Sequence, residues 1–314
     1  MGEWLKSVVL NSTIPQGVAG SNPALSAYID QVLVMTVIAH AHLLPSMKTI
    51  LDSVREVKFL PKSYSMIRAC IQDFPEVEII EPPMSFRAGG IIDMHREFLR
   101  TSLVRLRPDE GTILLDSGGL LTEVFDGLFP NVKRHSIQLT RYGCRKSMKD
   151  AIHFGADERK LAFDSVCAEA IVFEAVRRFD LNSRVAVCGK GSMGNAIAAL
   201  LPGSIHLSGV EGECPEVDVF FGATGYDISR LAHLSRAAHL VSCSSWDIEF
   251  QGLLREKDEV LSFLDGDVEV RRGHVSIYNA GCPLNFNRKK ELEAAEALLP
   301  MRRLVLEEIY NCRT

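Results

Sequence analysis

The sequence predicts an α/β protein with two Rossmann-like domains, each built on a parallel sheet. Short apolar runs rich in β-branched residues alternate with amphipathic helical patterns, and this alternation is typical of βαβ units. A long helical segment at 157–179 interrupts the alternation, and a second series of strands and helices follows it. The chain has 314 residues, which is enough for two domains of ordinary size.

The first series of elements begins at Leu33. Its expected strands are 33–39, 56–60, 77–80, 112–116 and 132–139, and its expected helices are 43–54, 90–106 and 120–128. The first of these helices carries Pro45 in its first turn, where a missing amide N–H is tolerated. Such a series forms a parallel sheet that helices cover on both faces.

The second series follows the helix 157–179, whose length and position suit a connector between domains. Its expected strands are 183–188, 204–208, 217–223 and 238–243, with a helix at 192–201, a hairpin at 267–279 and helical structure at 288–312. We therefore expect a first domain at 35–165, a smaller second domain at 166–284, and a C-terminal segment, 285–314, that packs back on the first domain.

The first 34 residues lack the basic start and apolar stretch of a signal peptide. Within them, "GVAGSNPA" (17–24) resembles the translated 3′ arm of a tRNA gene. We expect translation to begin at Met35 and residues 1–34 to carry no function. A flexible natural extension is the alternative, and the upstream nucleotide sequence distinguishes the two.

Composition and charge exclude several classes of partner. The net charge is −5, so there is no basic footprint for nucleic acid, and no apolar run approaches the roughly 20 residues of a membrane span. None of the eight cysteines forms a C-x-x-C pair, so neither a metal site of the zinc-ribbon type nor a redox disulfide is indicated. Scattered cysteines are typical of a reducing compartment, and we expect a cytoplasmic protein. The oligomeric state stays open, with a homo-oligomer among the expectations.

The stretch "VAVCGKGSMGNA" (185–196) predicts a strand, a glycine-rich turn and a helix. Gly189, Gly191 and Gly194 have the G-x-G-x-x-G spacing of a dinucleotide-binding turn. The first glycine permits the turn, the second lets the backbone approach a pyrophosphate, and the third lets the helix pack on the strand. Ser192 and Met193 open the helix, where unpaired N–H groups face an anion. We therefore predict that these five residues bind a dinucleotide.

The second part of that fingerprint is missing. An acidic residue that binds the ribose is expected at the end of the next strand, but the strand 204–208 ends in Ser208. The nearest acids, Glu211 and Glu213, stand in the following loop. Few residues separate Ser208 from the next strand, which leaves no room for the usual crossover helix. A purely structural glycine turn is therefore the competing interpretation.

Six segments, taken together, resemble the S-adenosylhomocysteine hydrolase (adenosylhomocysteinase) family. Their order and rough spacing agree with that family across most of residues 35–300. The segments are "TILLDSGGLLT" (112–122), "ERKLAFDS" (158–165), "VAVCGKGSMGNA" (185–196), "DVFFGATGYDIS" (218–229), "LVSCSSWDIEF" (240–250) and "GCPLNF" (281–286). The resemblance implies a substrate-type first domain, a shortened NAD-binding second domain, and a nucleoside or nucleotide as the small-molecule partner.

The chemistry implied by the family is oxidation of a ribose hydroxyl by bound NAD, followed by proton removal and loss of a thiol. The resemblance places proton transfer on Lys160 and Asp164, and substrate contacts on Asp116 and on His40 or His42. It further implies cofactor contacts at three positions: Thr224, Gly225 and Asn285. A plain ion pair explains Lys160 and Asp164 equally well. For Asp116, at a strand end before two glycines, we favour ligand contact over turn capping.

Several departures put hydrolysis in doubt. Ser117 replaces the family's second aspartate, Leu139 replaces a glutamate and Ser245 replaces a histidine. Each lost proton-transfer group is typically worth roughly 10²–10⁴-fold in rate, so we expect the family's reaction to be altered or lost. Two alternatives remain: a small NAD(P)-dependent oxidoreductase of a keto or hydroxy acid, and a non-catalytic regulatory or scaffold protein on the same fold.

Overall fold

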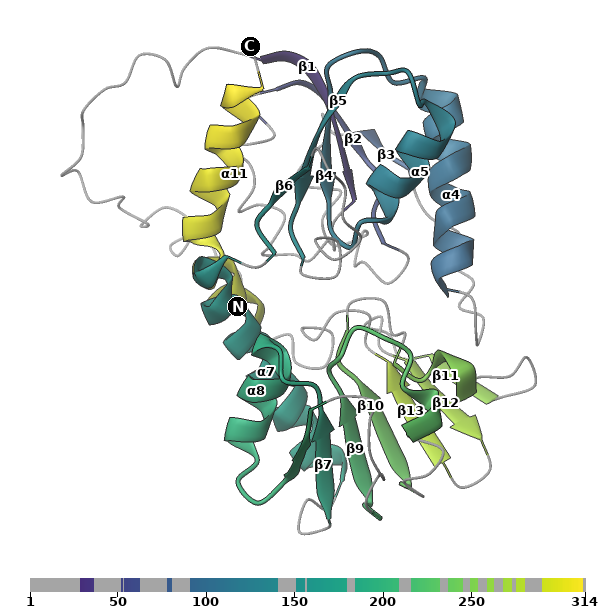
Figure 1. Cartoon of the computed structure of the whole chain (residues 1–314), viewed down its shortest axis with the longest axis vertical. Helices are drawn as coiled ribbons and strands as arrows, with labels where there is room; N and C mark the ends of the chain where they lie inside the picture. Colours follow the sequence, from purple (N-terminus) through teal and green to yellow (C-terminus); the bar gives the residue numbers. More distant parts are fainter. Residues whose placement is uncertain are drawn as a thin grey trace, which may run out of the picture.

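A computed structural model gives an α/β fold with two separate sheets, each built mainly of parallel strands, which confirms the predicted fold class (Figure 1). The structure describes residues 29–36, 52, 54–62, 78–80, 91–140, 151–155, 157–179, 184–208, 216–231, 237–244, 249–253, 259–262, 268–272, 275–279 and 290–312. The expected helix at 43–54 lies almost entirely outside these residues.

The first sheet has six parallel strands in the order β3-β2-β1-β4-β5-β6. The strands are β1 (Ile29–Thr36), β2 (Val54–Phe59), β3 (Glu78–Ile79), β4 (Thr112–Asp116), β5 (Arg134–Gln138) and β6 (Ala151–His153). The helices α4 (Ile91–Leu106) and α5 (Leu120–Leu128) follow β3 and β4. The order reverses between β1 and β4, so the carboxyl ends of these two strands flank the switch point of the sheet.

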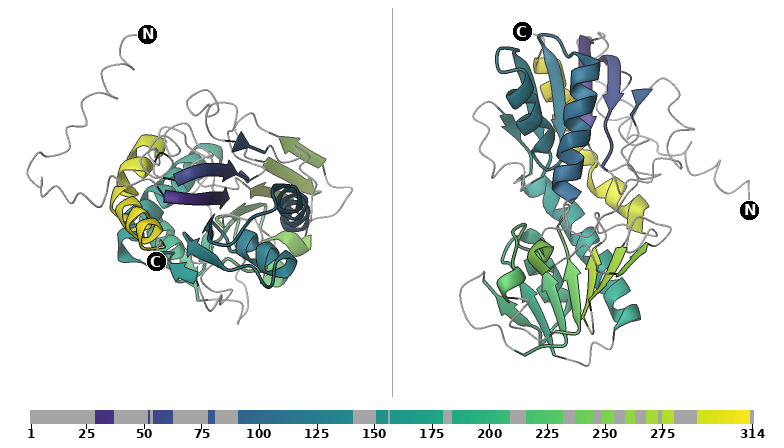
Figure 2. Two further views of the ribbon diagram at one scale, coloured as in Figure 1. Left: turned by 90° about the horizontal axis from the view of Figure 1, so that it is seen from above. Right: turned by 90° about the vertical axis from the view of Figure 1, so that its right-hand side faces the viewer.

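Alternation along the strands divides the first sheet into two apolar faces. Leu33 and Met35 of β1 pack in one core with α11 (Leu299–Asn311), whereas Val34 packs in another core with α4 and α5. Successive side chains of a strand point to opposite faces of the sheet, so these two cores lie on opposite faces. Helices therefore cover both faces. Figures 1 and 2 show α11 on one side of the sheet and α4 and α5 on the other.

The second sheet has the order β11-β12-β13-β10-β9-β7-β8. Its parallel strands are β7 (Val185–Cys188), β8 (Ile205–Leu207), β9 (Val219–Gly222), β10 (His239–Ser242) and β13 (Val275–Asn279). The expected hairpin is present as β12 (Val268–Arg272) and β13, and β11 (Glu259–Ser262) adds a further antiparallel strand. The expected strands and hairpin of this half are therefore confirmed, and β11 was not foreseen.

Two helices cover one face of the second sheet: α7 (Leu161–Arg178) and α8 (Ser192–Leu200). Val187 of β7 and Phe221 of β9 share a core with α7 and with Ile197 of α8. On the opposite face, Ala186 and Phe220 pack with Phe250 and other residues of the connecting segments. The glycine-rich turn joins β7 to α8 and so lies where the sheet meets these helices.

The helical structure expected at 288–312 is present as two helices. α10 (Glu291–Ala297) ends before α11 begins, and Pro300 stands in the first turn of α11, where its missing N–H is tolerated. Ala294 and Ala295 of α10 pack against α7, while α11 packs on the first sheet.

The connector differs from expectation, since α7 is preceded by a 3-10 turn at Glu158–Lys160. Among the described helices, none is both long and apolar enough to cross a membrane.

Candidate functional site

The switch point of the second sheet lies between β7 and β9. Cys188 and Gly222, the last residues of these two strands, are register partners, and the chain leaves β7 through Gly189. The Ala223 amide N–H donates to the Cys188 carbonyl at 2.8 Å, which holds the two strand ends together. Open α/β sheets bind ligands outside the carboxyl ends of the strands at such a point. The glycine turn and the loop after β9 therefore form the edges of the candidate site.

The first and third glycines of the turn are required by the packing of the turn itself. Gly189 has φ of 119°, and a Cβ there would lie 2.5 Å from the Ala223 carbonyl oxygen. A Cβ on Gly194 would lie 2.0 Å from the carbonyl oxygen of Gly189. Both contacts are with backbone atoms, which cannot swing aside, so only glycine allows β7, α8 and the loop after β9 to approach this closely.

Gly191 differs from these two glycines. Its φ of −75° and ψ of 178° are open to any residue, so the backbone conformation does not require glycine there. Gly191 precedes α8, and no described side chain caps this helix, whose first N–H groups have no partner within the helix. A glycine whose backbone conformation is open to other residues, at the start of a helix, fits close approach of an anion.

The structure joins the predicted acid–base pair to the glycine turn. Asp164, in the first turn of α7, is 5% exposed; one carboxylate oxygen pairs with the ammonium of Lys160. The other carboxylate oxygen accepts a hydrogen bond from the Ser192 hydroxyl at 2.5 Å. Lys160, Asp164 and Ser192 thus form one connected group, which we call the Asp164 group. It spans the start of α7 and the start of α8.

A double-mutant cycle should detect the link between Asp164 and Ser192. We expect Asp164→Ala and Ser192→Ala to show a coupling energy of about 1–2 kcal/mol, because the second substitution removes a bond that the first has already broken. The free energies of unfolding of the four proteins, measured in urea, give the coupling. Additive effects of the two substitutions would mean that the bond contributes nothing.

Two contacts hold the glycine turn against β8. The Gly189 amide donates to the carbonyl of Leu207, and the Nε2 of His206 lies 2.8 Å from the carbonyl oxygen of Gly189. An N–H at that nitrogen would donate to the carbonyl. Ser208, at the position of the expected ribose-binding acid, is exposed, and Glu211 and Glu213 lie outside the described residues. The contact of His206 escaped sequence analysis because a histidine within a short strand carries no local pattern.

The loop after β9 contains Thr224 and Gly225, both half-buried. Gly225 has φ of 70°, in the left-handed region, and its amide donates to a carboxylate oxygen of Glu249 at 3.1 Å. Glu249 is fully buried, and this burial raises the pKa of its carboxyl group. Sequence analysis gave Glu249 no role in the site, since neither its burial nor its partner can be read from a local motif.

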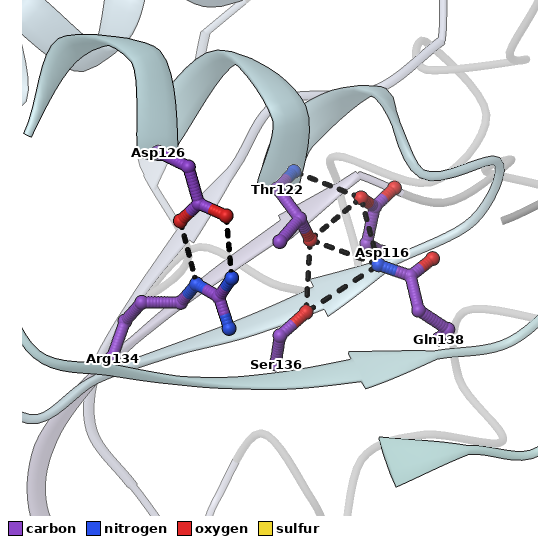
Figure 3. A network of polar contacts seen from close by, with 6 residues as sticks. All are labelled: Asp116, Thr122, Asp126, Arg134, Ser136 and Gln138. Atoms are coloured by element: carbon purple, nitrogen blue, oxygen red, sulfur yellow. Dashed lines mark hydrogen bonds and ion pairs between the residues drawn. The ribbon is translucent and has the colours of Figure 1, made fainter. Parts of the chain in front are cut away.

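Asp116 caps the turn that leads into α5, which is the role that was weighed against ligand contact for this residue. Its carboxylate is fully buried and accepts hydrogen bonds from four donors, of which Figure 3 draws those from Thr122 and Gln138. The donors are the amides of Gly119 and Thr122, the Thr122 hydroxyl and the side-chain amide of Gln138, at 2.9–3.1 Å. Burial raises the pKa of Asp116, against these hydrogen bonds. With both oxygens occupied, the carboxylate serves the turn.

Two further buried polar residues, Lys62 and His95, were not foreseen from the sequence. Lys62 follows the end of β2 and is fully buried, and its positive charge acts on both Asp116 and His95. His95 of α4 is 1% exposed; burial, aided by the charge of Lys62, lowers its pKa to about 3. His95 is therefore neutral at physiological pH. Burial of this kind leaves no trace in a local sequence pattern.

The remaining predicted positions are placed as follows. Gly191, Ser192 and Met193 are half-buried at the start of α8. His40, His42 and Asn285 lie outside the described residues. Within the part of the chain that the structure describes, no group of three or more His, Cys, Asp or Glu side chains is placed to hold a metal ion.

No protein-family model matches the sequence, and no curated protein matches it. Among solved structures, it is similar to a hetero-hexameric glutamate dehydrogenase from Thermus thermophilus, with 13% identity, 90% of this chain and 74% of that chain covered, and a TM-score of 0.30. A putative UDP-N-acetylglucosamine 2-epimerase from Listeria monocytogenes has 8% identity, 85% and 91% coverage, and a TM-score of 0.26. Likenesses of this size do not indicate a function for this chain.

Proposed function

We propose that the protein binds a nicotinamide dinucleotide, NAD or NADP, at the glycine turn 189–194 and acts on a nucleoside-type substrate, as an altered adenosylhomocysteinase-like protein. The observation that carries this proposal is the Asp164 group. Ser192 of the glycine turn and the acid–base candidates Lys160 and Asp164 share one carboxylate. Cofactor-binding and proton-transfer candidates that stand 28 residues apart in the sequence are therefore in contact.

The residues that the structure describes fit the pyrophosphate of a dinucleotide but lack the usual acidic partner for its ribose. Gly191 and the first N–H groups of α8 would face the pyrophosphate, and Thr224 and Gly225 would border it from the loop after β9. The cofactor, when bound, supplies hydride acceptance. Lys160 would hold or release a proton at Nζ, with Asp164 keeping the ammonium in place. Ser208 would leave the ribose without the usual carboxylate partner.

Gly191→Ala tests the cofactor site without straining the turn. The backbone conformation at Gly191 is open to alanine, but alanine is less favourable than glycine at this N-cap position, so we expect a loss of stability of about 1 kcal/mol or less. The added Cβ would stand where the pyrophosphate is proposed to approach, so we expect at least about a tenfold rise in the Kd for the dinucleotide. Titration calorimetry of the full chain with NAD+ and with NADP+ measures the affinity. Mass spectrometry of the denatured wild-type protein detects any cofactor that co-purifies.

Gly127→Ala in α5 is the matched control for Gly191→Ala, because nothing lies within 4 Å of its added Cβ and the residue is far from the turn in the sequence. It should bind as the wild type does. The proposal fails if the wild type releases no dinucleotide and binds neither NAD+ nor NADP+, or if Gly191→Ala binds as tightly as the wild type.

A non-catalytic scaffold is the second candidate, and the occupation of Asp116 favours it. The carboxylate that the family resemblance assigned to substrate is enclosed in a capping network, and the next residue is Ser117 in place of an acid. On this alternative the glycine turn is structural only. Absence of dinucleotide binding by the wild type, together with stable folding, would support the scaffold over the enzyme.

A further inference from the structure

Glu249 connects three parts of the second sheet's carboxyl edge. One carboxylate oxygen accepts from the Gly225 amide at 3.1 Å, and the other accepts from the Ser242 hydroxyl, at the end of β10, at 2.6 Å. The main-chain carbonyl of the same residue accepts from the Ile228 amide at 2.7 Å. The side chain also packs on the end of β9, since a Cβ on Gly222 would lie 2.8 Å from its Cγ.

These contacts continue to the glycine turn. The loop that Glu249 holds begins at Ala223, whose carbonyl oxygen is the atom that a Cβ on Gly189 would strike at 2.5 Å. The amide of Ala223 in turn bonds to the end of β7. A shift of the loop therefore moves atoms that lie directly against the first glycine of the turn. The Ala223 amide thus fixes the start of the loop, and Glu249 fixes its continuation at Gly225.

We propose that Glu249 is a positioning residue for the dinucleotide site, fixing the loop 223–226 against the glycine turn so that Thr224 and Gly225 border the ligand; this rests on the proposed function. Glu249 itself is fully buried, so its place in this proposal is behind the loop and not in contact with the ligand. It acts through the Gly225 amide and through Gly222. A carboxylate is suited to this task because its two oxygens accept from donors at different strand ends: the Gly225 amide after β9, and the hydroxyls of Ser242 and Ser244 at and after the end of β10.

The burial of Glu249 supports this role over simple packing. A buried carboxyl group costs free energy through desolvation, and this burial raises the pKa of Glu249 despite its hydrogen bonds. An apolar side chain would fill the same space without that cost but would leave the Gly225 amide and the Ser242 hydroxyl without this acceptor. The polar group is therefore explained by the contacts it makes to the loop.

The experiment compares Glu249→Ala and Glu249→Gln in the full chain. Glutamine keeps an oxygen for the Gly225 amide and offers an amide N–H to Ser242, whereas alanine removes both contacts. We expect the Kd for NAD+, or for NADP+ if that is the dinucleotide bound, to rise about tenfold or more in Glu249→Ala and to stay within about threefold in Glu249→Gln. Affinities are measured below the melting temperature of every variant.

Hydrogen exchange gives a second readout with an internal reference. The Gly225 amide bonds to the side chain of Glu249, and the Ile228 amide bonds to its main chain. In Glu249→Ala we expect exchange at Gly225 to accelerate at least about tenfold while exchange at Ile228 is nearly unchanged, because only the first bond is lost. Equal acceleration at both amides would mean general loosening of the fold and would overturn the positioning role.

Glu174→Gln is the matched control, since Glu174 is a buried carboxylate on α7 whose partners are Arg177 and Arg178. It should leave dinucleotide affinity as in the wild type. Unchanged affinity or unchanged Gly225 exchange in Glu249→Ala overturns the proposal for Glu249. Failure of the wild type to bind NAD+ and NADP+ overturns the proposed function instead, and the exchange result still decides whether Glu249 anchors the loop.

Discussion

Replacing Gly194 with alanine should destabilise the protein by about 3 kcal/mol, toward the upper end of what overpacking costs. In an ordinary helix the same substitution stabilises by about 0.5–1 kcal/mol, because alanine loses less backbone entropy on folding. Here the added Cβ would stand 2.0 Å from the carbonyl oxygen of Gly189. Both sides of this contact are backbone, so α8 must move away from β7 before the methyl group fits.

Urea denaturation of the full chain measures this change in the free energy of unfolding. Gly127→Ala in α5 is the control, because it is also a helical glycine but has open space around its added Cβ. It should stabilise the protein by about 0.5–1 kcal/mol. Opposite signs for the two substitutions are the expected result. A stabilising effect at Gly194 would show that the turn is less tightly packed than described.

Asp116→Ala should destabilise the protein by about 4 kcal/mol, because it leaves several buried donors without their acceptor. Three of the four donors share one oxygen of Asp116: the Thr122 amide, the Thr122 hydroxyl and the Gln138 amide group. The charge of Lys62, which is fully buried, also loses a nearby counter-charge. Water cannot replace these contacts without opening the end of the sheet.

Asp126→Ala is the matched control for Asp116→Ala. Asp126 lies in the same close-up and pairs with Arg134 through both carboxylate oxygens, but 46% of its side chain is exposed (Figure 3). Its partner Arg134 has only 9% of its side chain exposed, so loss of this pair should cost about 1.5–3 kcal/mol, less than the loss of Asp116. Thermal and urea denaturation distinguish the two. Equal losses would mean that the four hydrogen bonds of Asp116 add little to stability.

The elements that sequence predicted most accurately have clear boundaries in the chain. The strand 112–116 and the helix 120–128 have the expected bounds, because Gly118 and Gly119 adopt positive φ values of 118° and 77° and reverse the chain between them. The strands β6 and β11 escaped prediction because their sequences carry no distinct apolar run.

For the site, sequence supplied the residue types but not their contacts. The spacing of the glycines is local, and so is the i,i+4 pairing of Lys160 with Asp164. The hydrogen bond from Ser192 to Asp164 joins two helices, and the hydrogen bond from the side-chain amide of Gln138 to Asp116 joins β5 to β4. Such contacts depend on tertiary packing, so the choice between ligand contact and turn capping at Asp116 could not be made from the sequence.

The return of the last helix to the first sheet has a consequence for the order of folding during synthesis. The core of that sheet, with Leu33 and Met35, is completed by Met301, Val305 and Ile309 of α11. These residues lie nearly 270 positions after β1 in the chain, so they leave the ribosome much later than β1 does. The second sheet, by contrast, is built with α7 and α8 from one continuous stretch, 161–279. The half of the protein that is made first is therefore the half that is finished last.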